Sequence, residues 1–277
     1  MRVQDYATKI AAWQQSMEAE IRVEDGWLSV IGLLWLQAGE NTFGSDAGND
    51  IILPADRSPA HAGTFWLVDD TVTVQLAENV IATADGQPIS GKLELQSDLS
   101  GSATIIALNS LLLHIIRRGE RYALRLRDKE SAALKNFSGR QWFPTQESYR
   151  VIGAFSPHPS PKTLQIVNTI GDTIPISSPG FVTFTLQGQT FSLDAHSERD
   201  GQPFFIIKDA TSGQTTYPAG RFLAAKWLDE RQIIIDFNQA VSPPCAFTDY
   251  ATCPLPPPQN HLPLKIEAGE KYVAIHH

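Results

Sequence analysis

The chain has 277 residues, which is enough for one large β domain or for two smaller ones that each bury a core. Hydrophobic residues make up 42% of it and charged residues 19%, proportions that exclude a globally disordered chain. The formal net charge is −8, and because an acidic surface repels phosphate backbones we expect no nucleic-acid partner.

The N-terminus and the apolar segments predict a cytoplasmic protein. Residues 1–5 lead into polar and charged residues and not into the apolar run of a signal peptide. The longest apolar stretch, residues 27–36, is too short to span a bilayer, so we expect no membrane association. Cys245 and Cys253 are the two cysteines of the chain, and both are expected to be reduced thiols in that compartment.

Residues 1–39 predict an N-terminal helical segment packed on the body of the protein. Apolar and aromatic residues recur there at helical spacing, at Tyr6, Ile10, Trp13 and Met17. Asp5 is the expected N-cap, and Trp13 is expected to pack against a sheet. The apolar stretch that follows, up to Gly39, is predicted to be buried as a helix or as a strand, because its hydrophobic residues show no clear period.

Residues 40–130 predict a β-sandwich, because the hydrophobic period changes to two. Val72, Val74 and Leu76 alternate with polar residues, and turn residues such as Asp85-Gly86 separate the apolar runs. Strands are expected at 51–53, 63–68, 72–76, 80–84, 92–95, 103–108, 111–117 and 122–127.

Residues 131–277 predict a second β domain, of sandwich or barrel type. Strands are expected at 149–155, 164–167, 181–186, 189–193, 204–207, 222–225 and 233–237. The segment 242–263 holds seven prolines and is therefore expected to be irregular. Because it also carries Phe247, Tyr250 and Leu255, it should wrap the body and shield Cys245. Asn260 is expected to satisfy backbone groups there.

Several short motifs form a pattern over nearly the whole chain. They are Trp35-Leu36 with Asn41–Ser45, Asp209–Gly213, Thr216-Tyr217, Gly220–Leu223, Asp236-Phe237-Asn238, Pro243–Thr248, Thr252–Pro256, Asn260 and Ala268–Lys271. This pattern resembles a bacterial and archaeal family known as a domain of unknown function. The resemblance implies no activity.

A second pattern lies within residues 40–127. Gly44-Ser45 is followed by a strand-like 49–54, by 58–62 with its Ser-Pro-Ala-His run, and by Asp85-Gly86. The order and spacing are similar to those of a forkhead-associated domain. The resemblance implies a sandwich, so the chain is predicted to be mainly β: an amphipathic helix, a forkhead-associated-like sandwich, and a second β domain with a proline-rich wrapping segment.

The second pattern departs from the forkhead-associated family at the positions that bind phosphate. Ser45 and Pro59 stand where that family has arginines, and Asp85 stands where it has asparagine. An anionic phosphothreonine requires those donors and that charge. We therefore expect no phosphothreonine peptide partner, and the resemblance concerns architecture.

Polar residues concentrate between positions 209 and 238 and form the candidate ligand site. The expected ligand-binding residues are Asp209, Thr211, Ser212, Tyr217, Arg221 and Asn238. The leading hypothesis is a small anionic ligand with Arg221 as the anion clamp, Tyr217 and Asn238 as orienting groups, and Asp236 as a positioned carboxylate. The alternative is a turn at Thr211-Ser212-Gly213 with Arg221 paired to Asp209 or Asp236.

Two other functions remain open from the sequence. A hydrolytic enzyme would use Asp236 or Cys245, and an interaction module would use the first sandwich as a docking surface. Cys245, Cys253 and His261 are spaced too widely for a usual zinc site, so no metal and no cofactor are expected.

Overall fold

The computed structural model describes residues 3–199 and 201–274, and the chain is mainly β, as predicted. It divides into two compact units. Unit 1 contains the N-terminal residues up to Ile21 and the chain from Ser138 onward, whereas unit 2 is the continuous segment Arg22–Phe137. Among the described residues, no helix combines the length and the hydropathy needed to cross a membrane.

Unit 2 is a sandwich of two sheets. The first has the strand order β1-β11-β10-β9-β6-β7, and the second has the order β3-β2-β4-β5-β8. The strands are β1 Val30–Trp35, β2 Gly39–Gly44, β3 Ile51–Ile52, β4 Gly63–Val68, β5 Thr71–Leu76, β6 Thr83–Ala84, β7 Gln87–Pro88, β8 Lys92–Leu95, β9 Ile106–Leu108, β10 Leu111–Arg118 and β11 Arg121–Asp128, followed by helix α2 Ala132–Asn136. Short 3₁₀ turns lie at Trp27–Ser29 and Asp98–Ser100.

The core of unit 2 lies between these two sheets. Val72 and Val74 of β5 face Leu113, Ile115 and Leu124 of the other sheet within one buried cluster. The alternation read from the sequence therefore identified the inward faces correctly, because successive strand residues point to opposite faces.

The prediction of one helical segment over residues 1–39 is wrong. Its helix ends at Ile21, and residues 30–35 form β1 and pair with β11 in unit 2. The run is apolar at nearly every position, so its sequence lacks the alternation that marks a strand and its period could not distinguish the two structures. The boundary between the two large parts lies at Phe137, seven residues beyond the expected 130.

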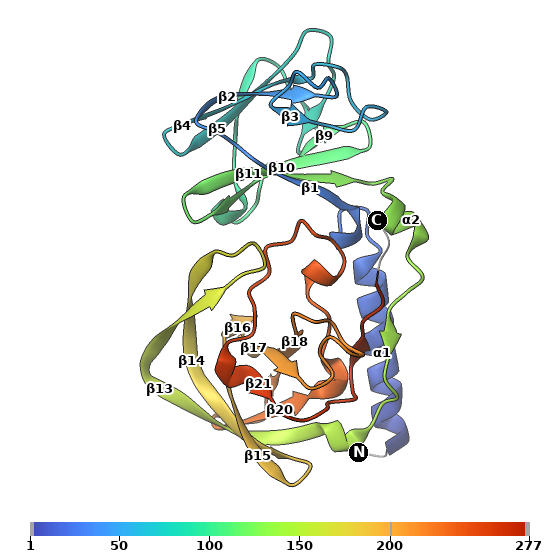
Figure 1. Cartoon of the computed structure of the whole chain (residues 1–277), viewed down its shortest axis with the longest axis vertical. Coiled ribbons are helices and arrows are strands. Elements are labelled where there is room, and N and C mark those ends of the chain that lie inside the picture. Colours follow the sequence, from blue (N-terminus) through green and yellow to red (C-terminus); the bar gives the residue numbers. More distant parts are fainter. Residues whose placement is uncertain (1–2, 200, 275–277) are drawn as a thin grey trace. The chain divides into compact units, whose positions relative to one another are not determined.

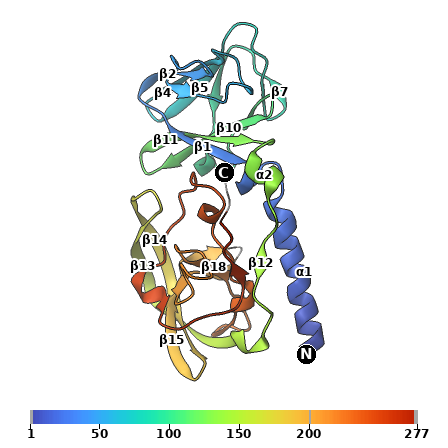
Figure 2. The ribbon, with the colours of Figure 1, turned by 45° about the vertical axis from the view of Figure 1, so that its right-hand side comes forward.

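Unit 1 holds the remaining elements. They are α1 Val3–Ile21, β12 Gln141–Trp142, β13 Arg150–Val167, β14 Thr173–Leu186, β15 Gln189–Asp194, β16 Ser197–Arg199, β17 Gln202–Asp209, β18 Arg221–Ala224, β19 Lys226–Trp227, β20 Gln232–Asp236, β21 His261–Leu262 and β22 Glu270–Lys271, with 3₁₀ turns at Glu147–Tyr149, Phe237–Gln239, Pro244–Ala246 and Pro258–Asn260. One sheet has the order β15-β14-β13-β20-β19, and a second has β16-β17-β18 with β21 beside β17. The long β13–β14 ribbon curves around one side of the unit (Figures 1 and 2).

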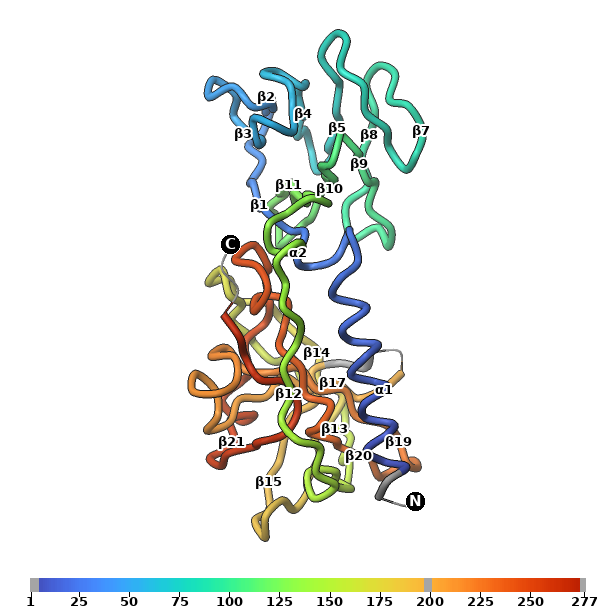
Figure 3. Tube along the Cα trace, turned by 90° about the vertical axis from the view of Figure 1, so that its right-hand side faces the viewer, coloured from blue at the N-terminus to red at the C-terminus, as the bar shows by residue number. Residues whose placement is uncertain are grey.

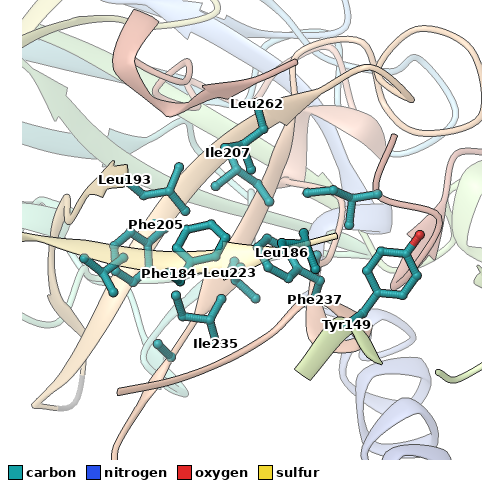
Figure 4. Close-up of a cluster of buried hydrophobic side chains, with 14 of the residues drawn as sticks. Tyr149, Phe184, Leu186, Leu193, Phe205, Ile207, Leu223, Ile235, Phe237 and Leu262 are labelled. Atoms are coloured by element: carbon teal, nitrogen blue, oxygen red, sulfur yellow. The ribbon is translucent and has the colours of Figure 1, made fainter. Parts of the chain in front are cut away.

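The core of unit 1 lies between its two larger sheets. Figure 4 shows Phe184 and Ile235 of one sheet meeting Phe205 and Leu223 of the other. Each of these side chains is at least 97% buried. At about 1.5–3 kcal/mol for each large apolar side chain, this cluster is the main stabilising feature of the unit.

Helix α1 is packed against unit 1 by its aromatic residues. Trp13 contacts Trp142 of β12 edge to face, with ring centroids 5.4 Å apart. Trp13 was expected to pack against a sheet, and β12 is a strand of one. The chain that contains β12 runs alongside α1 in Figure 3. β12 pairs in turn with β22 near the other end of the chain.

The proline-rich segment 242–263 wraps unit 1, as predicted. Leu255 N donates to Val167 O at 2.8 Å, and the Asn260 amide bonds to the backbone of Asp194 and of Ile206. Phe247 is buried, whereas Tyr250 is 40% exposed and does not contribute the expected apolar burial.

Candidate functional site

The candidate ligand residues between 209 and 221 lie at the junction of β17 and β18. Ile207 pairs with Arg221, which brings the start of β18 close to Asp209 at the end of β17. Gly220 makes this pairing possible, because its φ is +96° and a Cβ there would lie 2.4 Å from Ile207 O. The two charged side chains therefore meet in the interior of unit 1.

Arg221 is fully enclosed by partners from its own chain. Its Nη2 contacts Asp209 Oδ2 and donates to Ile266 O at 3.1 Å, and its Nη1 donates to Ala268 O. Its side chain is 1% exposed. Burial lowers the pKa of Arg221, and the Asp209 carboxylate opposes that effect. The charge that was expected to hold an anion is already neutralised by Asp209.

Thr211 and Ser212 belong to the turn that follows β17. Thr211 donates its backbone N–H to Asp209 Oδ1 at 2.7 Å and its hydroxyl to the same oxygen. Thr216 Oγ1 lies 2.9 Å from Thr211 Oγ1, and Asp209 N donates to Ser212 Oγ at 3.2 Å. The structure therefore contains both the turn and the Arg221–Asp209 pair of the alternative interpretation.

Asp236 and Asn238 form a separate group with Tyr6. The Tyr6 hydroxyl lies 2.9 Å from both oxygens of the Asp236 carboxylate. Asn238 Nδ2 lies 3.0 Å from both Asp236 Oδ1 and Tyr6 Oη, and donates to Gln146 O at 2.8 Å. Burial, then the charge of Asp236, raises the pKa of Tyr6. This group connects α1 to the end of β20. The sequence placed Tyr6 on the apolar face of the helix and gave no signal for its polar contact.

A third group contains both cysteines. Cys245 lies in the turn Pro244–Ala246 and is partly exposed, whereas Cys253 is buried, and both are present as thiols. Cys245 N donates to Cys253 Sγ at 3.3 Å, and the two side chains are also within hydrogen-bonding reach. The segment therefore buries Cys253 and shields Cys245 in part, which is less than the shielding expected from the sequence.

Tyr217 lies beside this pair of cysteines and not beside Arg221. Its hydroxyl donates to Cys245 O at 2.6 Å and lies within reach of the Cys245 side chain. Its ring meets Tyr272 edge to face at 5.0 Å. Burial, then the proximity of Cys245, raises the pKa of Tyr217, so its hydroxyl stays protonated and able to donate.

These neighbours change the acidity of Cys245. The hydrogen bond from Cys253 lowers the pKa of the Cys245 thiol, and the contact with Tyr217 lowers it further, against the opposing effect of burial. A thiolate is the reactive form of cysteine, so this environment favours reaction at Cys245.

Cys253 is held in place by Thr169, just beyond the end of β13. Cys253 N donates to Thr169 Oγ1 at 3.1 Å, and Thr169 N donates to Cys253 O at 2.9 Å. The Thr169 hydroxyl donates in turn to Ala251 O at 2.8 Å. The sequence missed this site because its parts, near positions 169, 217 and 245–253, are far apart along the chain.

Residues 135–271 match the family described as "Protein of unknown function (DUF1684)". A solution NMR structure of an uncharacterised protein of Haloarcula marismortui is 30% identical over 50% of this chain and 78% of that one, with a TM-score of 0.41. The second half of the chain is therefore similar to this family of unknown function. The match contains all of the candidate residues from Asp209 to Cys253, whereas the expected likeness at 35–45 lies outside it.

Two other solved structures are similar at low identity. The FHA domain of FhaA, in a complex with the intracellular domain of Rv3910, is 13% identical over 34% of this chain and 97% of that one, with a TM-score of 0.24. Rad53 residues 1–466, in a complex with AMP-PNP, is 13% identical over 72% of this chain and 46% of that one, with a TM-score of 0.18. A comparison with curated proteins gives no match.

One further charged group lies near the start of the proline-rich segment. Glu270 accepts from Arg140 Nη1 at 2.6 Å and from Ser242 N at 2.8 Å. Burial raises the pKa of Glu270 to about 7 despite the nearby arginines. Within residues 3–199 and 201–274, histidine, cysteine and carboxylate side chains form no cluster of three suited to a metal ion.

Proposed function

We propose that unit 1 is a small-molecule site whose reacting group is the thiolate of Cys245. The observation that carries this proposal is the contrast in accessibility among the candidate groups. Cys245 is partly exposed, whereas Arg221, Asp236 and Asn238 are each at least 94% buried and bonded to their own chain. Cys245 is therefore the candidate group that lies nearest to solvent.

An anionic ligand at Arg221 is the weaker candidate. Such a ligand would have to replace the Asp209 carboxylate and leave it buried without its partner. Removing one member of a buried ion pair costs about 3–5 kcal/mol. A hydrolytic role for Asp236 meets a similar obstacle, because Tyr6 and Asn238 occupy its carboxylate oxygens.

The chemistry of Cys245 suits a small, soft electrophile. The thiolate attacks the electrophilic atom, and the Tyr217 hydroxyl, which donates to Cys245 O, lies beside it. The buried Cys253 supplies a second donor from the interior. The ligand is therefore expected to bind covalently at the surface around Cys245.

Alkylation by iodoacetamide tests this proposal directly. The full chain is labelled over a range of pH, and mass spectrometry separates the labelling of Cys245 from that of Cys253. We expect Cys245 to label in the native protein with a rate midpoint below the value of about 8.5 for free cysteine. Cys253 should label only after unfolding.

Two variants and one control refine the test. Tyr217→Phe and Cys253→Ala should each raise the pH midpoint of Cys245 labelling, because each removes a group that lowers the pKa of the Cys245 thiol. Tyr250→Phe is the matched control, since Tyr250 is 40% exposed and its hydroxyl has no part in the site. A midpoint at or above that of free cysteine in the unmodified chain would overturn the proposal.

A further inference from the structure

We propose that Cys245 and Cys253 form a peroxide-oxidised dithiol, in which Cys245 reacts with a hydroperoxide and Cys253 closes a disulfide. This inference rests on the proposed reactivity of Cys245 and names the substrate class for it. The proposal stands on the geometry of two adjacent thiols, one partly exposed and one buried.

The two thiols are already brought together in the reduced protein. Cys253 Sγ lies 3.3 Å from Cys245 N, so the sulfur of one residue touches the backbone of the other. Thr169 fixes the backbone of Cys253 on one side, and Tyr217 fixes the carbonyl of Cys245 on the other. The two cysteines are therefore held next to each other before any oxidation takes place.

The first step oxidises Cys245. Its thiolate attacks one oxygen of the hydroperoxide, so that an S–O bond forms and the O–O bond breaks. The leaving oxygen takes up the proton that the thiol had released and departs as water or as an alcohol. Cys245 becomes a sulfenic acid, oxidised by two electrons, and the peroxide is reduced by the same two electrons. The Tyr217 hydroxyl holds the Cys245 backbone in place during this step through its hydrogen bond to Cys245 O.

The second step uses Cys253. Its thiol loses a proton and attacks the sulfur of Cys245, forming the S–S bond and expelling the sulfenic oxygen as water. The N–H of Cys245 points at Cys253 Sγ and stabilises the negative charge that develops there. Overall, two thiols and one hydroperoxide give one disulfide, one water and one further water or alcohol.

The unequal exposure of the two cysteines assigns their roles. The partly exposed Cys245 is the one that a peroxide can reach, and the buried Cys253 is protected from direct oxidation. A resolving thiol already in contact also limits the time that Cys245 spends as a sulfenic acid, and so limits its irreversible oxidation. A thiol reductant restores the starting state.

The experiment treats the full chain with one equivalent of hydrogen peroxide. Thiols are then titrated under denaturing conditions, and intact mass is measured before and after reduction. We expect both thiols to be lost, together with two hydrogens, and to return with dithiothreitol. A peptide that links Cys245 to Cys253 should be found after digestion without reductant.

Variants separate the two steps. Cys253→Ser should stop at a sulfenic acid on Cys245 that dimedone traps, and Cys245→Ser should leave Cys253 unoxidised under the same conditions. Tyr250→Phe is again the matched control and should behave as the unmodified chain does. Thermal melting of each variant verifies that it is folded.

The outcomes distinguish this inference from the proposed function. If Cys245 alkylates with a lowered midpoint but peroxide yields a trapped sulfenic acid and no internal disulfide in the unmodified chain, the dithiol inference is overturned and the reactive thiol remains. A disulfide that forms between two chains overturns it in the same way. If Cys245 neither alkylates in the native protein nor reacts with peroxide, both proposals are overturned.

Discussion

Tyr6 and Asp236 are 230 residues apart in the chain, yet the Tyr6 hydroxyl is in hydrogen-bond contact with both oxygens of the Asp236 carboxylate. This contact joins the first turns of α1 to the end of β20 inside unit 1. Because the carboxylate is 94% buried, the hydroxyl replaces water that the folded chain excludes.

Replacing Tyr6 by phenylalanine should therefore destabilise unit 1. The variant keeps the ring and leaves a buried carboxylate short of one donor, which costs about 1–3 kcal/mol. Denaturant unfolding of the full chain measures the loss. Tyr250→Phe, at an exposed tyrosine, should change stability by less than about 0.5 kcal/mol. Equal effects of the two substitutions would contradict the role given to Tyr6.

The Arg221–Asp209 pair should behave as a buried unit. Arg221→Met or Asp209→Asn alone should cost about 3–5 kcal/mol, because each leaves the other group without its charge partner. The double variant should be less destabilised than the sum of the two, and a double-mutant cycle from denaturant unfolding measures the coupling. Additive effects would show that the two side chains do not depend on each other.

Glu270 should make the stability of unit 1 depend on pH. Its pKa rises from 4.5 to about 7 on folding, so the folded chain keeps a proton that the unfolded chain has released. The resulting stabilisation is complete below pH 4.5 and is lost as the pH rises to about 7. A shift of this size corresponds to about 3 kcal/mol.

The measurement for Glu270 compares the unmodified chain with Glu270→Gln. The difference between their free energies of unfolding should change by about 3 kcal/mol between pH 4.5 and pH 7, in the direction that disfavours the unmodified chain at the higher pH. Burial lowers the pKa of His196 to about 4. Such buried histidines titrate in both proteins, so their contributions cancel in the difference between the two free energies of unfolding. A constant difference would contradict the raised pKa.

Truncation at Ser242 should unfold unit 1. The missing part contains Asn260, which holds the backbones of Asp194 and Ile206, and the carbonyls of Ile266 and Ala268 that accept from Arg221. Asn260→Ala alone should cost about 2 kcal/mol or more, since it leaves buried backbone groups unpaired. Thermal unfolding of the three proteins tests this. An unchanged melting temperature after truncation would show that the segment is dispensable.

Unit 2 should not bind phosphothreonine peptides tightly. The Ser45 hydroxyl donates to Ser58 O at 3.1 Å, and the nearby Arg57 is bonded to Glu130 and lies 3.7 Å from Asp128. No arginine therefore takes the place of the family's phosphate-binding residue at Ser45. Titration of a phosphothreonine peptide library against the full chain tests this prediction. Micromolar affinity for any member would contradict it.

The alternation of apolar and polar residues predicted the strands that have one solvent-exposed face and one buried face. Val182, Phe184 and Leu186 were expected to point inward, and all three are at least 97% buried. β13 was missed as a single strand, because prolines at 157, 159 and 161 obscure its middle, where the structure shows a shift of register against β14. The alternation of apolar and polar residues therefore fails to predict a strand in which irregular positions interrupt the buried ones.

The sequence identified several of the polar residues of the candidate site, but it did not predict which of them contact each other. The sequence placed Asp209, Tyr217, Arg221 and Asn238 together because they are close along the chain, and the structure distributes them among three groups. The direction of a side chain from a turn depends on the fold, and distant partners such as Tyr6 and Thr169 decide which group each residue joins. No pattern of spacing within one segment contains that information.

The order in which the elements of unit 1 are synthesised bears on how the protein folds in a cell. Tyr6 is synthesised before the whole of unit 2, whereas the carbonyls that accept from Arg221 belong to Ile266 and Ala268 and are synthesised after it. Unit 2 is continuous from Arg22 to Phe137 and can close while translation proceeds. Unit 1 cannot be completed until residues 138–268 have followed unit 2, so α1 is synthesised well before the partner that Tyr6 contacts, Asp236.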